Sequence, residues 1–213
     1  MSFNQTNVEN LVGTVEGFVR DHDEFRKKVG EVNARRDLSE EYKRARVEAM
    51  ADEFREAHAG TVQAITDAEK AFQADVDAYS NGVDLDSEYM GTLSRAIGMF
   101  GAKMPSDVTA KLVSKATRPW EARMAAAAFE NAGIKSGPGA ASARAQALTP
   151  RQAGSFASRA YIAIKDPVRG GLDGDFYAWR NNVQNTVDLM QYGPGGNPNA
   201  DAGQGGSAGT DAE

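Results

Sequence analysis

Apolar residues recur at helical spacing from residue 6 to residue 79, and charged residues fill most of the positions between them. The first half of this stretch contains two interleaved seven-residue series, which are Val8, Val15, His22 and Val29, and Leu11, Phe18, Phe25 and Val32. Heptads of this kind predict a helix with one apolar seam that packs along a partner helix. The rest of the chain is expected to join this stretch as shorter helices.

A break at residues 33–38 separates this helix from a second one, which is predicted to continue to about Tyr79. Its apolar line is Val47, Met50, Phe54, either Ala57 or His58, Val62, Ile65, Ala68, Phe72, Val76 and Tyr79. A short connection favours an antiparallel hairpin. At 1.5 Å per residue the first helix spans about 40 Å and the second about 60 Å. The end of the second helix therefore needs another partner, which we expect to be later helices of the chain or a second copy of it.

Turn and capping signals divide the remainder into four segments. Residues 86–134 are predicted to form three short helices, the last of which stops at Gly133 with Ile134 placed for a Schellman contact. Residues 135–148 are rich in Gly, Pro, Ala and Ser and are predicted to be a linker. A two-helix segment is expected over residues 149–192, and residues 193–213 lack large apolar residues and are predicted to be disordered.

Thr149, Pro150 and Gln152 have the pattern of a capping box with proline in the first turn, so they predict the start of the first helix of the two-helix segment. The buried face predicted for that helix is Phe156, Ala160, Tyr161 and Ile164. No run of alternating β-branched residues predicts a strand. The expected fold class is therefore all-α, with a helical hairpin or coiled coil over residues 1–85, short-helix subdomains and a disordered C-terminal tail.

Composition restricts the chemistry. The 213 residues include no cysteine, so disulfides and thiolate metal sites are excluded. We see no signal peptide, and the longest apolar run, residues 124–129, is too short to span a membrane. Residues 1–85 hold 11 Lys and Arg against 18 Asp and Glu, whereas residues 134–192 hold 7 against 4. An acidic first part and a mildly basic later part can attract a basic partner or pair with another copy.

Few residues have a pattern typical of catalysis or ligand binding. His22 lies between Asp21 and Asp23, but adjacent helix positions point about 100° apart, so we expect a histidine of the seam and not a metal ligand. Asp173, Gly174 and Asp175 lack the later glycine and glutamate of a calcium loop. Neither a nucleotide-binding loop nor a nucleophile elbow occurs. We therefore predict no catalytic residue, no cofactor and no metal.

Large apolar and aromatic residues are the candidates for protein contacts. The predicted interaction residues are Phe18, Phe25, Phe54, Ile65, Phe72, Val76, Tyr79, Trp120 and Trp179. Core packing is the alternative for each of them. Arg151, Arg159 and Arg180 leave open a second function, which is an oligomeric nucleic-acid-binding protein for packaging or regulation.

Residues 33–43, with the sequence NARRDLSEEYK, lead into a long charged helix. This stretch resembles small helical proteins of the structural gene clusters of tailed bacteriophages, which are scaffold-like or minor structural proteins. The resemblance covers about a third of the chain and implies a component of the virion or of its assembly, in the particle or in the host cytoplasm. The expected function is non-enzymatic, through helix-mediated contacts with other copies and with a virion structural protein. Neither nucleic acid nor a membrane is an expected partner.

Overall fold

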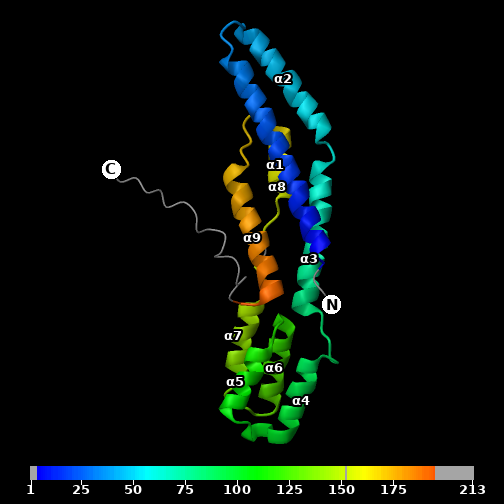
Figure 1. Cartoon of the computed structure of the whole chain (residues 1–213), viewed down its shortest axis with the longest axis vertical. Helices are drawn as coiled ribbons and strands as arrows, with labels where there is room; N and C mark the ends of the chain where they lie inside the picture. Colours follow the sequence, from blue (N-terminus) through cyan, green and yellow to red (C-terminus); the bar gives the residue numbers. More distant parts are fainter. Residues whose placement is uncertain (1–3, 152, 195–213) are drawn as a thin grey trace, which may run out of the picture. The chain divides into compact units, whose positions relative to one another are not determined.

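The computed structural model describes residues 4–151 and 153–194, and within them the chain is all-α with no strand (Figure 1). Contacts divide the described chain into two compact units. We call residues 4–75 and 153–183 the hairpin unit, and residues 76–151 and 184–194 the short-helix unit. The tail expected to be disordered lies, from residue 195 onward, outside the described residues. In the described part of the chain, no helix is long and apolar enough to cross a membrane.

The hairpin unit begins with α1 (Gln5–Ala34) and α2 (Glu40–Ala57), which pack side by side as an antiparallel pair (Figure 1). The Asn4 side chain accepts a hydrogen bond from the Thr6 backbone N–H at 3.2 Å and caps α1. The Ser39 hydroxyl accepts from the Tyr42 N–H at 3.2 Å and caps α2. The buried residues of α1 are Leu11, Val15, Phe18, Val19, His22, Phe25 and Val29. Six of the eight seam residues predicted from the heptads are thus buried, and Val8 and Val32 at the two ends of the seam are partly exposed.

The single second helix that we expected is two helices, α2 and α3 (Thr61–Asn81), separated at residues 58–60. A glycine such as Gly60 destabilises a helix by about 1 kcal/mol relative to alanine. Hydrogen bonds within the turn replace helical hydrogen bonds that the break removes. The Thr61 N–H donates to the His58 carbonyl at 3.0 Å, and the Thr61 hydroxyl lies 3.1 Å from His58 Nδ1. The chain therefore turns where the expected helix was continuous.

Two later helices complete the hairpin unit, α8 (Ala157–Lys165) and the first part of α9 (Asp173–Tyr192). Ile65 and Phe72 of α3, predicted to lack a partner within the hairpin, are buried in the single chain. The Asn7 side chain donates to the Asp75 carboxylate at 2.9 Å, which ties the start of α1 to α3. Later helices of the same chain, and not a second copy, are therefore part of the unit that buries these residues.

The start of α8 corrects our prediction of a helix from Thr149. Thr149 instead ends the preceding helix, with its hydroxyl donating to the Ala145 carbonyl at 2.7 Å, and Gln152 lies outside the described residues. The Glu69 carboxylate of α3 accepts hydrogen bonds from the Ser155 hydroxyl at 2.8 Å and from the backbone N–H of Phe156. Helix α8 is therefore capped by a distant carboxylate, and its own N-cap residue, Phe156, supplies no side-chain hydrogen bond.

The short-helix unit contains α4 (Glu88–Phe100), a 3₁₀ turn η1 (Gly101–Lys103), α5 (Ser106–Lys115), α6 (Pro119–Asn131) and α7 (Pro138–Leu148). Its core comprises Tyr89, Leu93, Met104, Leu112, Val113, Ala116, Ala122, Ala125, Phe129, Ile134, Ala141, Ala145 and Leu148. Gly133 has φ 71°, and the Ile134 N–H donates to the Phe129 carbonyl at 2.8 Å. The Schellman motif predicted at the end of α6 is confirmed.

The linker predicted over residues 135–148 is wrong, because most of it forms α7. Pro138 occupies the first turn, where proline is tolerated. Ala141, Ala145 and Leu148 share one face and are buried against α6. The Arg144 guanidinium donates to the Ala116 carbonyl at 3.0 Å, which attaches α7 to the end of α5. Small side chains on both helices permit this packing, and the same composition indicated a linker to us.

Replacing Gly137 with alanine should destabilise the protein. Gly137 has φ −98°, which any residue adopts, but a Cβ atom would lie 2.7 Å from Phe129 Cγ and 3.0 Å from Thr109 Cγ2. Overpacking of this kind costs about 1–3 kcal/mol. Urea unfolding of the full chain measures the change. Gly139→Ala is the matched control, because nothing lies within 4 Å of its Cβ position, and it should be neutral or stabilising.

Glu69→Ala should destabilise the hairpin unit by about 1–2 kcal/mol, since it removes the cap of α8. Glu53→Ala, an exposed carboxylate of α2 whose nearest cation is 4.0 Å away, is the control. Hydrogen exchange of the amides of α8 locates the effect. Equal protection of α8 in the Glu69→Ala variant and the wild type would contradict the assigned role of Glu69.

Candidate functional site

The residues predicted to contact other proteins are mostly inside the chain. Of the nine, only Tyr79 is partly accessible, and Phe18, Phe25, Phe54, Ile65, Phe72, Val76, Trp120 and Trp179 are buried. The Tyr79 hydroxyl donates to the Thr117 carbonyl at 3.0 Å, and burial raises the pKa of this tyrosine. Core packing therefore accounts for these side chains, so a surface for partners has to come from other residues.

A cluster of aromatic rings surrounds the two histidines in the hairpin unit. His22 is fully buried, with its ring centroid 5.8 Å from that of Phe54 and 6.3 Å from that of Phe18. The His58 ring lies 4.3 Å from Phe54 and 5.2 Å from Phe18. In the described residues no three His, Asp or Glu side chains gather in a way that could hold a metal ion. The histidines pack as part of the core.

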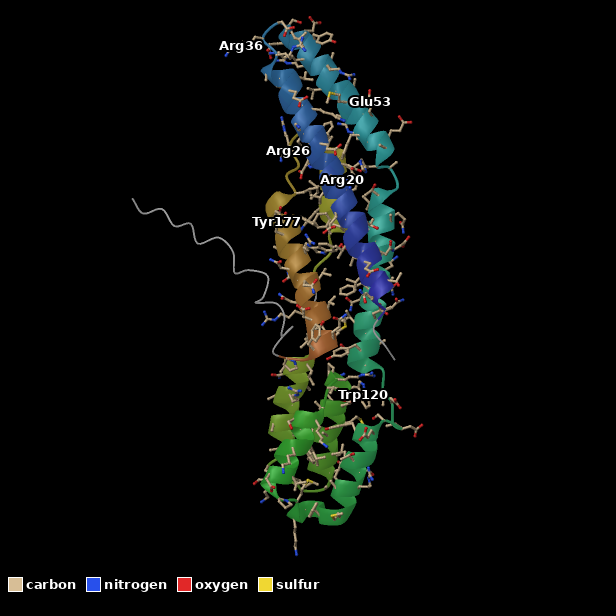
Figure 2. All side chains as sticks on the ribbon, in the orientation of Figure 1. Arg20, Arg26, Arg36, Glu53, Trp120 and Tyr177 are labelled. Atoms are coloured by element: carbon tan, nitrogen blue, oxygen red, sulfur yellow. The ribbon has the colours of Figure 1, made fainter. Side chains whose placement is uncertain are left out.

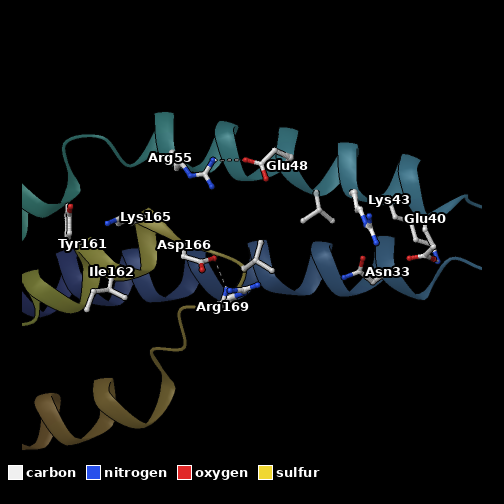
Figure 3. Close-up of a pocket in the computed structure, with 13 residues that line it drawn as sticks. Asn33, Glu40, Lys43, Glu48, Arg55, Tyr161, Ile162, Lys165, Asp166 and Arg169 are labelled. Atoms are coloured by element: carbon white, nitrogen blue, oxygen red, sulfur yellow. Dashed lines mark hydrogen bonds and ion pairs between the residues drawn. The ribbon is translucent and has the colours of Figure 1, made fainter.

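An open groove of about 1020 Å³ lies between α2 and α8 (Figure 3). We call it the α2–α8 groove. Its lining consists of Asn33, Glu40, Lys43, Arg44, Val47, Glu48, Arg55, Tyr161, Ile162, Lys165, Asp166, Val168 and Arg169. All of these residues belong to the hairpin unit, and α2 contacts α8 directly. The groove is therefore a property of one compact unit.

Three of the five cations that line the groove form no ion pair within the described chain, and the other two are paired with carboxylates of α2. On α2, Lys43 pairs with Glu40 at 2.8 Å and Arg55 pairs with Glu48 at 3.2 Å. Arg44, Lys165 and Arg169 form no ion pair with any described residue. The groove thus offers three exposed cations to a partner.

The Asp166 carboxylate, the third acidic group of the lining, accepts a hydrogen bond from the backbone N–H of Arg169 at 3.3 Å. It therefore serves to hold the turn after α8, and it leaves the Arg169 guanidinium free of an ion pair within the described chain.

Apolar side chains are also exposed in this groove. Tyr161, Ile162 and Val168 are 56%, 61% and 41% exposed. The buried residues of α8 are instead Ala157, Ala160 and Ala163, which contradicts the buried face that we predicted for Tyr161. A helix with alanines inward and its tyrosine and an isoleucine outward reverses the usual arrangement. Exposed apolar side chains of this kind mark interaction surfaces.

The turn after α8 holds Val168 and Arg169 in place. The Gly170 N–H donates to the Asp166 carbonyl at 2.8 Å, and Pro167 is buried. A Cβ atom at Gly170 would lie 2.8 Å from Ala163 Cα, so the turn packs closely on α8. The groove residues of this turn are therefore already positioned before a partner binds.

A second groove, of about 580 Å³, lies between α1 and α9. Tyr177 of α9 is 64% exposed there, and Arg20 of α1 is part of the same lining (Figure 2). Arg180 pairs with Glu16 across this groove at 3.1 Å. Its charges are closer to balanced than those of the α2–α8 groove, since its lining holds Arg20, Lys27 and Arg180 against Glu16, Asp23 and Glu24.

The arginines considered for nucleic-acid binding have carboxylate partners in two of three cases. Arg159 pairs with Asp175 at 2.7 Å, and Arg180 pairs with Glu16. Arg151 is exposed and belongs to the other unit. Two of the three arginines are therefore paired with carboxylates, and the third lies in the other unit.

Sequence reasoning missed the α2–α8 groove because its two sides lie far apart in the chain. One local signal was present, since Ile162 lies on the side of the helix opposite to the small residues Ala157, Ala160 and Ala163. Comparison with protein-family models, curated proteins and solved structures gave no match. The function has to be argued from the surface itself.

Protonation of His58 should weaken the fold. Burial lowers the pKa of His58 from its usual 6.5, and Asp21, 4.0 Å from Nε2, opposes this effect. The unfolded chain therefore binds the proton more readily, so the free energy of unfolding should fall as pH falls below about 6.5. Urea unfolding between pH 7.5 and 5.5 measures the slope. His58→Gln should reduce the slope and Asp21→Asn should increase it, whereas equal slopes would contradict this account.

Proposed function

We propose that the chain is a non-enzymatic structural or assembly protein that acts through contacts between helices of separate protein molecules, including other copies of itself. The observation that carries the proposal is the α2–α8 groove. There, Tyr161 and Ile162 are exposed beside the cations Lys165 and Arg169, which form no ion pair among the described residues. Apolar side chains among unpaired charges suit a protein partner, because burying both together gives affinity and orientation.

The heptad seam of α1 is buried within the chain, which favours the α2–α8 groove as the surface that binds partners. The large apolar residues of α1 are buried within the chain, so they are not available to bind another molecule without unfolding. The groove needs no rearrangement of the core, since its apolar residues already face solvent. A protein that binds through such a surface can remain folded before and after assembly.

We place this role in the particle of a tailed bacteriophage, as a scaffold-like or minor structural component found in the virion or the host cytoplasm. The support is the resemblance of residues 33–43, which form the end of α1, the turn and the first residues of α2. The second partner on this proposal is a virion structural protein. The alternative of a nucleic-acid-binding packaging protein has less support, because Arg159 and Arg180 are paired with carboxylates.

Sedimentation equilibrium over a concentration series at 50 mM and 500 mM salt tests the proposal. We expect a weight-average mass above that of the 22.7 kDa chain, with a smaller excess at high salt because exposed charges are screened. The mass of a single chain at every concentration and at both salt levels would contradict self-association. Cosedimentation with assembled phage shells is the corresponding test of the virion partner.

A further inference from the structure

One exposed segment of the short-helix unit carries apolar side chains and carboxylates that form no ion pair in the described part of the chain, and it therefore complements the apolar residues and cations of the α2–α8 groove. Between α3 and α4, Val83 and Leu85 are 55% and 65% exposed. The same segment has three exposed carboxylates: Asp84 lies between Val83 and Leu85, and Asp86 and Glu88 come after Leu85. None of these carboxylates forms an ion pair with a described residue. We call residues 82–88 the acidic segment.

Hydrogen bonds give the acidic segment a defined conformation. The Asp84 carboxylate accepts from the Asp86 N–H at 3.1 Å, and the Asp84 carbonyl accepts from the Ser87 N–H at 3.3 Å. The Ser87 hydroxyl accepts from the Met90 N–H at 3.3 Å and caps α4. Because the turn is already formed, a partner that binds it has less conformational entropy to remove.

We propose that the α2–α8 groove of one molecule binds the acidic segment of a second copy. This inference rests on the proposed function, with the α2–α8 groove as the binding surface and a second copy of the chain as the partner. Val83 and Leu85 would pack on Tyr161, Ile162 and Val168, which are the exposed apolar residues of the groove.

The carboxylates Asp86 and Glu88 would meet the cations Arg44, Lys165 and Arg169. The charges are opposite, and neither set forms an ion pair within the described chain. Both sides of one contact are thus present on every molecule, which identifies a second copy as the occupant.

The groove and the segment are different surfaces, so each molecule can bind a second copy in two ways. Two copies that each bind the other's segment form a closed two-fold dimer, whereas contacts that do not close in this way produce a larger ring or an open filament. The weight-average mass should therefore reach at least that of two chains as concentration increases. The contact also depends on exposed charges, so it should weaken at high salt.

Charge exchange between the surfaces tests the proposal in the full-length chain. The groove variant is Lys165→Glu with Arg169→Glu, and the segment variant is Asp86→Lys with Glu88→Lys. Each variant alone should self-associate at least about tenfold more weakly, because like charges then face each other. An equimolar mixture should recover association, since each groove meets a segment of opposite charge. Arg36→Glu with Lys70→Glu, two exposed cations of the hairpin unit outside the groove, is the control with the same change in charge.

The outcomes separate this inference from the proposed function. Weakening in both variants, recovery in the mixture and an unchanged control would support the contact. Association that persists in both variants, or that falls equally in the control, would overturn the contact and leave the proposed function standing. A wild-type chain that remains a single molecule at every concentration would overturn both.

Removal of the apolar half of the contact gives a second measurement in the full-length chain. Val83→Ser with Leu85→Ser changes two exposed side chains, so the fold should be kept. The variant should self-associate more weakly than the wild type, because the apolar area of Val83 and Leu85 is no longer buried in the groove. Self-association equal to that of the wild type would contradict the proposed site.

Discussion

The apolar face of α1 is the constraint on which the hairpin unit depends. This helix has 30 residues, whereas its antiparallel neighbour α2 has 18. Burying a large apolar side chain stabilises a protein by about 1.5–3 kcal/mol, so a face that extends from Leu11 to Val29 cannot remain exposed. The chain meets this requirement with α3 and with two helices from its C-terminal part. The residues that close the hairpin unit are thus distant in sequence from those that begin it.

The groove follows from the way in which the chain covers this face. Helix α8 packs through Ala157, Ala160 and Ala163, which are small enough to allow close approach to its neighbours. The same packing leaves Tyr161 and Ile162 on the outside, next to Lys165. A surface suited to a partner is therefore a product of the packing, and it involves no strained backbone and no buried charge.

Local signals predicted the parts of this fold that local interactions determine. The face of α1 and the stop at Gly133 depend on residues within a few turns, and both were predictable. The cap of α8 was not, because Glu69 lies 87 residues before Phe156 and only the folded chain brings them together. Helix α7 was hidden for another reason. Its buried face is largely alanine, and an alanine face within a Gly- and Pro-rich segment has the composition of a linker. The α2–α8 groove was not predictable for two reasons. Its two sides are distant in sequence, and Tyr161, which is exposed in it, was expected to be buried.

The separation between Glu69 and Phe156 also sets an order of events on the ribosome. At about 5–20 residues per second, Phe156 is synthesised roughly 4–17 s after Glu69. The core cluster of the short-helix unit ends at Leu148, so its residues are all synthesised before the start of α8. Until α8 emerges, Ile65 and Phe72 lack the helices that complete their unit. The nascent chain therefore carries the core residues of the short-helix unit within an unfinished hairpin, and a chain that stops before residue 157 leaves Ile65 and Phe72 without two of the helices of their unit.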